Sequence, residues 1–318
     1  MKAVVVGGGS WGCVFAALLA EAGNHVVLAC RDAAQAEAIR ITGRNPRYFP
    51  ELDLGGVHAL PLPEAPLGDA ELVALAVPSA AFREVVAALP PGAPVLSLVK
   101  GLDPGSGERL SRLLQGRQAA VLSGPNLAPE IARGLPAAAV IASQEERFAA
   151  TLQQAIMSPR FRIYVNADVV GVELCAAAKN VIALGAGAVD GLAMGDNAKA
   201  ALLTRGLAEM VRLGTAGGAR PETFAGLAGM GDLIVTCWSR HSRNRRAGEL
   251  IARGASPREA RAEIGSSVEG LTTAPVLRDV ARRLGIELPI TEAVCAVLAG
   301  ADPREAVAAL MERPPTGE

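Results

Sequence analysis

The chain has 318 residues, of which half are hydrophobic and 3% aromatic, and its net charge at pH 7 is −1. This near-neutral charge excludes a general nucleic-acid-binding surface, and no apolar run reaches the about 18 residues of a membrane span. The five cysteines are scattered and form no CxxC pair, which predicts free thiols in a cytoplasmic protein. No set of His, Cys or Asp residues has the spacing of metal ligands, so no metal is expected.

The first half of the chain alternates short β-runs with helical patterns. Strands are expected at residues 2–6, 25–29, 71–77, 95–99, 119–122, 138–142 and 161–166, and helices at 12–22, 80–88 and 108–114. This alternation predicts a parallel sheet covered by helices. Residues 41–56 interrupt the pattern and are expected to form a loop at the carboxyl edge of the sheet.

The second half is predicted to be helical. Helices are expected at residues 168–185, 197–216, 221–227, 245–253, 257–263, 272–284, 290–299 and 303–311. Ser256 before Pro257 and Asp302 before Pro303 are typical pairs of an N-cap residue and a first-turn proline. We therefore expect an α/β domain over residues 1–168 and an all-α domain over residues 169–318.

A glycine-rich loop follows the first predicted strand. Gly7, Gly9 and Gly12 match G-x-G-x-x-G between a strand and a helix, the context of a Rossmann-like dinucleotide-binding turn. At the end of the second strand, Arg31 favours the 2′-phosphate of NADP, while Asp32 suits the ribose hydroxyls of NAD. Either charge could also be an ordinary solvated strand end. The expected cofactor is NAD or NADP, with Arg31 favouring NADP.

Lysine is rare in this chain, with four residues against twenty-seven arginines. Lys179 lies in an apolar helical stretch, and lysine can lose its proton there whereas arginine cannot. It is a candidate acid or base, although a snorkelling side chain is the alternative. Lys100 ends a predicted strand at the edge where ligands bind in such sheets, or is an ordinary exposed lysine. Lys2 and Lys199 are interpreted as incidental.

Residues 239–246, here called the basic segment, contain four arginines and a histidine just before a predicted helix. Arginine forms bidentate bonds with phosphate, and Ser242 and Asn244 add neutral donors. Because a helix N-terminus favours anions, four cations there indicate an anion site more than helix capping. A solvated helix start remains the alternative for Arg240, Arg245 and Arg246.

Several longer stretches together resemble the bacterial-type NAD(P)-dependent glycerol-3-phosphate dehydrogenases along nearly the whole chain. The AAAKN and SRNRR elements in this order are a strong signal of that family. The matching stretches are GGGSWG (7–12), AVPSAAF (76–82), SLVKGLDPGSGERLS (97–111), LSGPNLAPEIARG (122–134), the run from GVELC to LAEM (171–210), GLAGMGDLIVTC (226–237), SRNRRAGELI (242–251), SVEGLTTA (267–274) and PITEAV (289–294).

The resemblance implies roles for individual residues. Lys179 is implied as the proton acceptor, and Lys100 is implied as a further catalytic residue. Asp232, a lone carboxylate in a glycine-rich turn, is implied as the catalytic residue that supports Lys179. Dinucleotide contacts are implied for Ser10, Trp11, Arg31, Tyr48, Lys100, Ala128, Arg243 and Glu269, besides the three loop glycines. Substrate contacts are implied for Lys100, Gly124, Asn126, Ser242, Arg243 and Asn244, beside Lys179 and Asp232. Asn126 stands where the family often has Ser, and Cys13 and Cys175 replace other small residues.

The implied reaction interconverts glycerol 3-phosphate and dihydroxyacetone phosphate, feeding glycerophospholipid synthesis. A 3-hydroxyacid or 6-phosphogluconate-type dehydrogenase is the nearest enzymatic alternative, but it would be expected to lack SRNRR after GMGD. The alternative of another class is a non-catalytic NAD(P)-sensing protein. The presence of Lys179 and Lys100 counts against it, because a sensing protein needs no catalytic lysine. The expected partner is a small phosphorylated substrate, and the Ala- and Leu-rich helical half favours a homodimer.

Overall fold

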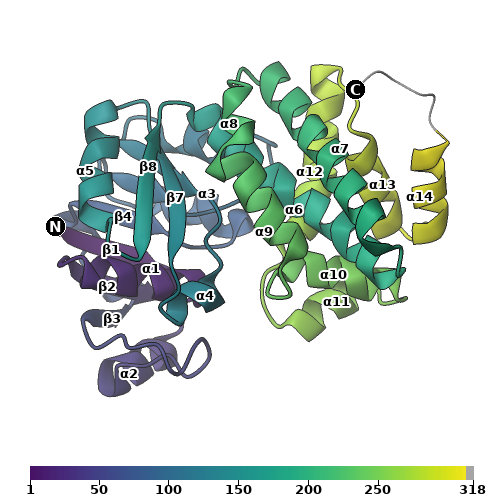
Figure 1. Cartoon of the computed structure of the whole chain (residues 1–318). Coiled ribbons are helices and arrows are strands. Elements are labelled where there is room, and N and C mark those ends of the chain that lie inside the picture. The colour runs from purple at the N-terminus through teal and green to yellow at the C-terminus, as the bar shows by residue number, and fades with distance from the viewer. Residues whose placement is uncertain (313–318) are drawn as a thin grey trace. The chain divides into compact units, whose positions relative to one another are not determined.

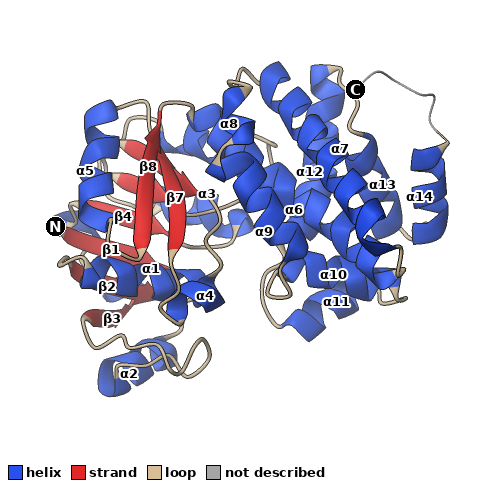
Figure 2. Ribbon diagram, in the orientation of Figure 1, coloured by secondary structure: helices blue, strands red, loops and turns tan. Residues whose placement is uncertain are grey.

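The computed structural model describes residues 1–312, which divide into two compact units. Unit 1 comprises Met1–Asp103 and Glu108–Glu173. Unit 2 comprises the short excursion Pro104–Gly107 and the chain from Leu174 onward. The described strands all belong to unit 1, and unit 2 is helical (Figures 1 and 2).

Unit 1 contains an eight-stranded sheet in the order β3-β2-β1-β4-β5-β6-β7-β8. The first six positions follow the doubly wound dinucleotide-binding order, which confirms the Rossmann-like expectation. All neighbouring strands are parallel except β6 and β7, which are antiparallel, so the sheet is not wholly parallel as predicted. The strands are β1 (Lys2–Val6), β2 (His25–Cys30), β3 (Val57–Pro61), β4 (Leu72–Leu75), β5 (Val95–Ser97), β6 (Ala119–Ser123), β7 (Ala137–Ala142) and β8 (Phe161–Asn166).

Helices cover both faces of this sheet. Alternate residues of a strand point to opposite faces, so the apolar strands present side chains for burial on each face. Ala3 and Val5 of β1 belong to one buried core, while Val4 and Val6 belong to the other. The first core packs under α1 (Ser10–Glu21), α4 (Ala128–Ala132) and α5 (Glu146–Ile156), and Figure 1 shows α5 alongside β8. The second packs under α3 (Ser79–Ala87) and the 3₁₀ turn η3 (Leu110–Leu114).

The stretch after β2 differs most from the sequence prediction. It forms α2 (Ala33–Thr42) and then β3, neither of which was predicted, and the expected loop covers only the residues between them. Asp32 caps α2 by accepting hydrogen bonds from the amides of Ala34 and Gln35. Gly43 ends the helix in the left-handed conformation (φ 65°). Also unpredicted were α4, α5 and two 3₁₀ turns, η1 (Leu62–Glu64) and η2 (Leu67–Asp69).

Unit 2 consists of helices joined by short turns. Two predicted caps are confirmed: Ser256 forms a capping box with Glu259, and the Asp302 side chain accepts from two amides of its helix. The π-helical turn η4 (Leu227–Gly231) and α9 (Asp232–Trp238) were not predicted, because the glycines there indicated a loop. The other helices are α6 (Val169–Gly191), α7 (Gly195–Ala216), α8 (Glu222–Ala225), α10 (Arg243–Ala252), α11 (Pro257–Ile264), α12 (Glu269–Leu284), α13 (Pro289–Leu298) and α14 (Pro303–Met311).

Helix α6 is long and largely apolar, and most of it belongs to unit 2. Within residues 1–312, it alone is long and apolar enough to cross a membrane by length and composition. However, 89% of its most apolar window is buried inside the protein. Its charged residues include Lys179 and Asp190, and both have ion-pair partners.

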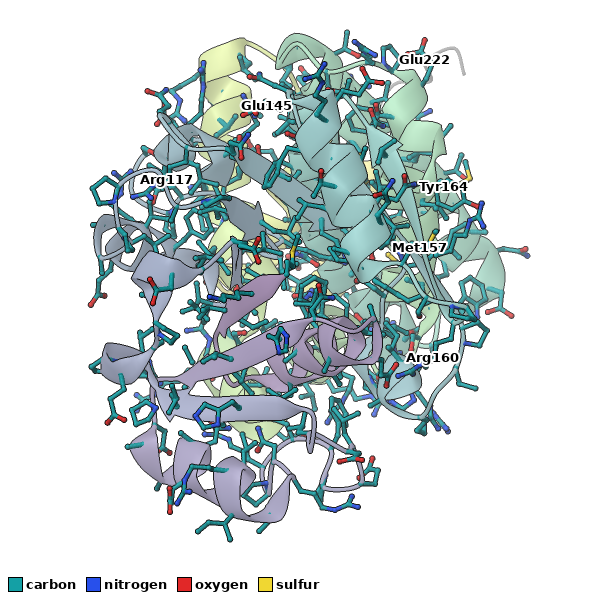
Figure 3. All side chains as sticks on the ribbon, turned by 90° about the vertical axis from the view of Figure 1, so that its left-hand side faces the viewer. Arg117, Glu145, Met157, Arg160, Tyr164 and Glu222 are labelled. Carbon is teal, nitrogen blue, oxygen red and sulfur yellow. The ribbon has the colours of Figure 1, made fainter. Side chains whose placement is uncertain are left out.

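Strand β8 forms one edge of the sheet and presents several side chains outward (Figure 3). Tyr164 is about half exposed, and the Arg162 guanidinium lies 5.6 Å from the centre of its ring. Arg160, just before the strand, forms an ion pair with Glu21 and donates to the Ile131 carbonyl oxygen. Charged side chains at a sheet edge disfavour pairing with the edge of another sheet.

All five cysteines are free and buried. Burial raises the pKa of the Cys13 and Cys295 thiols to about 11, and that of the Cys30 and Cys237 thiols to about 12. Because the thiolate is the reactive form, we expect the native protein at pH 8 not to react with a thiol-specific disulfide reagent within minutes. Five thiols should react after unfolding in guanidinium chloride. Rapid reaction of the native protein would contradict the buried placement.

Candidate active site

The glycine loop lies between β1 and α1. Gly7 has a φ of 123°, a conformation that side chains disfavour, and a Cβ on Gly12 would lie 1.8 Å from the Gly7 carbonyl oxygen. No side chain caps α1 at Gly9, and a Cβ on Gly9 would meet no atom within 4 Å. The first turn of α1 is therefore open at a helix N-terminus, where amide N–H groups and the helix dipole favour an anion.

Two side chains that the sequence analysis did not identify hold this loop in place. The Gly8 carbonyl oxygen accepts hydrogen bonds from Gln35 Nε2 at 2.9 Å and from Asn45 Nδ2 at 3.2 Å. Asn45 is fully buried, and its Oδ1 accepts from the amide of Tyr48 at 3.2 Å. Asn45 thereby ties the segment that carries Tyr48 to the glycine loop. Its position before Pro46 is a turn signal that could have identified it.

The other expected dinucleotide contacts of unit 1 surround this loop or follow β2. Arg31 is exposed, and its guanidinium has no partner within residues 1–312. Asp32 instead caps α2, so its carboxylate already accepts two amide hydrogen bonds. Trp11 packs on Phe15 at 5.9 Å between ring centres, and its buried Nε1 has no hydrogen-bond partner among the described residues. Ala128 begins α4 and packs against the same core as Trp11.

Three expected substrate residues come together beyond the carboxyl ends of β5 and β6. Lys100 Nζ donates to the Gly124 carbonyl oxygen at 3.0 Å and to Asn126 Oδ1 at 2.6 Å. Gly124 has a φ of 126°, and a Cβ there would lie 3.0 Å from Ala139 Cα, so glycine is required. The buried Asn126 Nδ2 has no partner among the described residues. Because unsatisfied buried donors are costly, this N–H is well suited to a ligand.

Lys179 on α6 and Asp232 on α9 form a buried ion pair. Lys179 Nζ lies 2.8 Å from Asp232 Oδ1 and 2.7 Å from the hydroxyl oxygen of Thr236, and the Lys179 and Asp232 side chains are 5% and 2% exposed. Thr236, which the sequence analysis missed, follows Asp232 by one helical turn, a spacing that could have identified it. A lysine ammonium has three N–H donors. Two serve these partners, and the third has none within residues 1–312.

The N-terminus of α10 holds the remaining expected substrate residues. Ser242 is the N-cap of α10 and accepts from the Arg245 amide at 3.2 Å, while the exposed Arg243 contacts Ser267 Oγ at 3.4 Å. Asn244 is buried: its Nδ2 donates to Asn180 Oδ1 at 2.8 Å, and its Oδ1 accepts from the Gly270 amide at 2.9 Å.

These bonds relate the basic segment to neighbouring elements of unit 2. Asn180 follows Lys179 directly in α6, and Gly270 follows Glu269 at the start of α12. The structure therefore brings Asn244 and Glu269 to the part of α6 that carries Lys179. Asn180 is a further residue that the sequence analysis missed.

Lys199 was interpreted as incidental, and this interpretation is wrong. Its side chain is buried, and its Nζ lies 2.9 Å from both carboxylate oxygens of Asp190. The Trp238 ring centre lies 4.8 Å from the same Nζ. Arg245, interpreted as a possible solvated cation, is also paired with Asp190. The basic segment is thus partly neutralised by residues distant in sequence, which spacing alone does not reveal.

The sequence also matches known protein families. Residues 2–149 match the family model for the N-terminus of NAD-dependent glycerol-3-phosphate dehydrogenase, and residues 168–308 match the model for its C-terminus. The chain belongs to this family.

Individual glycerol-3-phosphate dehydrogenases are similar to this chain over nearly its full length. The enzyme named glycerol-3-phosphate dehydrogenase [NAD(P)+] from Moorella thermoacetica is 47% identical, covering 99% of this chain and 96% of its own. The enzyme of that name from Streptomyces coelicolor is 45% identical, covering 98% and 97%. The crystal structure of glycerol-3-phosphate dehydrogenase from Coxiella burnetii has a TM-score of 0.93 at 37% identity, covering 98% and 99%.

As a member of this glycerol-3-phosphate dehydrogenase family, the chain is an NAD(P)-dependent oxidoreductase. The open N-terminus of α1 and the unpartnered Trp11 Nε1 fit a bound dinucleotide. Within residues 1–312, no group of three or more His, Cys, Asp or Glu side chains is arranged to hold a metal ion.

Substitution of Gly12 by alanine should damage the dinucleotide loop. The added Cβ would collide with the Gly7 carbonyl oxygen, so we expect lower stability by about 1–3 kcal/mol and NAD(P)H affinity weaker by at least roughly tenfold. Thermal unfolding and fluorescence titration with NADH and NADPH measure the two effects. Gly68→Ala is the matched control, because a Cβ on Gly68 meets no atom within 4 Å. Unchanged cofactor affinity in Gly12→Ala would contradict the steric argument.

Proposed function

We propose that this dehydrogenase interconverts sn-glycerol 3-phosphate and dihydroxyacetone phosphate with Lys179 as the general acid and base. The observation that carries the proposal is the buried Lys179, held by Asp232 and Thr236 with one N–H left over. Further support comes from the family membership of the chain. Residues 1–168 serve as the dinucleotide-binding domain and residues 169–318 as the substrate domain, of which residues 313–318 lie outside the described part.

The chain's residues would hold the cofactor mainly through the glycine loop. Gly7, Gly9 and Gly12 leave the amides of α1 open to a pyrophosphate, with Ser10 and Trp11 beside them. Arg31 is exposed and free to meet a 2′-phosphate, which favours NADP over NAD. The remaining contacts are those proposed from the sequence, made by Tyr48, Lys100, Ala128, Arg243 and Glu269.

Proton transfer is assigned to Lys179. When bound, NAD(P) supplies the hydride acceptor or donor for C2 of the substrate. On oxidation, the neutral Lys179 amine takes the proton of the C2 hydroxyl as the C2=O bond forms. On reduction, the Lys179 ammonium returns a proton to the carbonyl oxygen. Asp232 stabilises the ammonium and, with Thr236, fixes its direction.

Substrate binding is assigned to two groups of residues. Lys100 offers a positive charge, and Asn126 Nδ2 offers a free donor beside Gly124 for the glycerol part. Ser242, Arg243 and Asn244 bind the phosphate at the N-terminus of α10, where the helix dipole adds to the charge of Arg243. Holding the remote phosphate orients C2 for reaction.

The test is the absorbance at 340 nm of the purified enzyme with dihydroxyacetone phosphate and either NADH or NADPH. We expect consumption of the reduced cofactor, with a higher kcat/KM for NADPH because of Arg31. Binding of either cofactor without consumption would overturn the catalytic proposal in favour of a sensing role. We further propose a cytoplasmic homodimer that feeds glycerophospholipid synthesis. Sedimentation of the purified protein tests the dimer.

A further inference from the structure

An ion cluster around Asp190 lies on the same helix as Lys179. Asp190 follows Lys179 by about three turns of α6 and therefore lies on the same side of it. Both of its carboxylate oxygens contact Lys199 on α7, and Oδ2 also accepts a bond from Arg245 Nη1 on α10. The Lys199 and Arg245 side chains are only 7% and 13% exposed. One carboxylate thus joins three helices.

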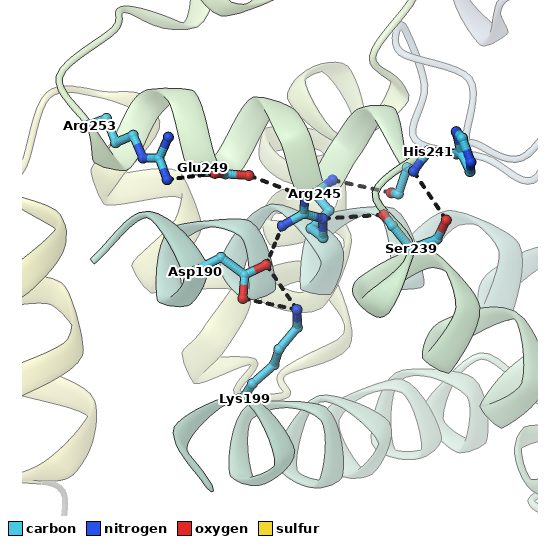
Figure 4. A network of polar contacts seen from close by, with 8 residues as sticks. Asp190, Lys199, Ser239, His241, Arg245, Glu249 and Arg253 are labelled. Carbon is cyan, nitrogen blue, oxygen red and sulfur yellow. Dashed lines mark hydrogen bonds and ion pairs between the residues drawn. The ribbon is translucent and has the colours of Figure 1, made fainter. Parts of the chain in front are cut away.

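The other nitrogens of the Arg245 guanidinium contact the loop before α10 and Glu249 on α10 itself (Figure 4). Its Nε donates to the Ser239 carbonyl oxygen at 3.2 Å, and its Nη2 lies 3.2 Å from Glu249 Oε2. Its backbone amide donates to the N-cap Ser242. Arg245 therefore contacts the beginning and the end of the loop from Ser239 to Ser242, which leads directly to Arg243 and Asn244.

Backbone packing holds α10 against α6 from Arg245 onward without these charges. A Cβ on Gly187 of α6 would lie 1.8 Å from the Arg245 carbonyl oxygen, and one on Gly248 would lie 1.9 Å from that of Leu184. The two helices are in close backbone contact at both places. The Ser239 carbonyl oxygen in the loop before α10 accepts from Arg245, which pairs with Asp190, so the ion cluster links this loop to α6.

Stability alone is a poor explanation for this cluster. Removing two charges from water costs free energy, and a buried ion pair recovers this cost only when its geometry is good. Apolar side chains of similar volume often stabilise the folded protein equally well. Asp190 accepts from two cations, while Arg245 spreads its bonds over three acceptors from three segments. Such an arrangement defines a geometry rather than filling a core.

We propose that Asp190 is a positioning residue for substrate binding, acting through Arg245 and Lys199. It fixes the loop from Ser239 to Ser242, and with it the N-cap and the first turn of α10, where Ser242 and Arg243 are proposed to bind the substrate phosphate. Trp238, at the end of α9, also contacts the cluster, because its ring centre lies 4.8 Å from Lys199 Nζ. The inference rests on the proposed function, since it assigns the purpose of that phosphate site.

The test compares Asp190→Asn and Arg245→Lys with the wild-type enzyme. Asn keeps the size of Asp but not its charge. Lys keeps the charge of Arg but lacks the planar set of N–H donors that lets Arg245 bond to several acceptors at once. For both variants we expect KM for dihydroxyacetone phosphate, and Ki for inorganic phosphate as a competitive inhibitor, to rise roughly tenfold. We expect kcat and KM for the reduced cofactor to stay within about twofold, because Lys179 and the glycine loop are untouched.

Asp196→Asn is the matched control, because Asp196 is an exposed carboxylate in the first turn of α7. The double variant Asp190→Asn/Arg243→Ala should raise Ki for phosphate by less than the product of the two single effects, since both act on one site. A merely structural role would lower the melting temperature and leave the phosphate Ki unchanged, and this result overturns the inference.

The single variant Arg243→Ala separates failure of this inference from failure of the proposed function. If Arg243→Ala raises the phosphate Ki and Asp190→Asn does not, only the positioning role is wrong. If neither variant changes it, the assignment of the phosphate site itself is wrong.

Discussion

Replacement of Lys179 by arginine should lower kcat by about two to four orders of magnitude, the usual contribution of a positioned acid or base. Arginine retains the positive charge and can still pair with Asp232, but it cannot give up a proton at any pH that the protein survives. The loss should therefore appear in kcat for both directions of the reaction. Steady-state kinetics at 340 nm with saturating cofactor measure it.

Two controls exclude a general defect in that variant. Lys2→Arg makes the same change at an exposed position of β1 and should have normal kinetics. NAD(P)H affinity and the melting temperature of Lys179→Arg should stay close to wild type, because no buried carboxylate is left without a cation. A near-normal kcat in Lys179→Arg would refute the acid–base role of this lysine.

The second large effect is expected for Arg243→Ala, which should raise KM for dihydroxyacetone phosphate by roughly tenfold to hundredfold. This range corresponds to the loss of a charge-assisted hydrogen bond of about 1.5–3 kcal/mol. KM for the reduced cofactor should rise less, because the glycine loop makes most of the proposed cofactor contacts. Initial rates over a range of substrate concentrations separate KM from kcat.

Arg246→Ala is the matched control for this variant. It removes the same charge from an exposed position on α10, three residues further along. A similar rise in KM for both variants would mean that net charge, and not a specific contact, attracts the substrate. An unchanged KM in Arg243→Ala would place the phosphate elsewhere.

Local patterns predicted the elements whose signals lie within a few residues. The first strand, the glycine loop and α1 follow one another within residues 2–21, and both proline-containing helix caps were predicted correctly. By contrast, Asp32 was interpreted as a ribose contact or a solvated strand end. Asp32 proves to cap α2, which a stronger weighting of the N-cap signal would have predicted.

Strand direction and helix formation around glycine were harder to predict. Nothing in the composition of β7 distinguishes a strand antiparallel to β6 from a parallel one, since side chains alternate in the same way in both. The glycines of η4, just before α9, indicated a loop, but these residues are helical, and a Cβ on Gly229 would lie 2.2 Å from the Phe224 carbonyl oxygen. Tertiary contacts can override weak local propensity.

The sequence by itself determined the glycine loop and the change from an α/β to a helical half, and it identified Lys179 as a candidate acid or base. Each of these follows from residue type and short spacing, which govern backbone conformation and the chemistry available to a side chain. Only the tertiary structure showed that Lys199 is buried against Asp190, that Thr236 and Asp232 share Lys179, and that Asn45 supports the glycine loop. Such pairings depend on which helix faces meet, and the free energy that decides them comes from packing between segments far apart in the chain.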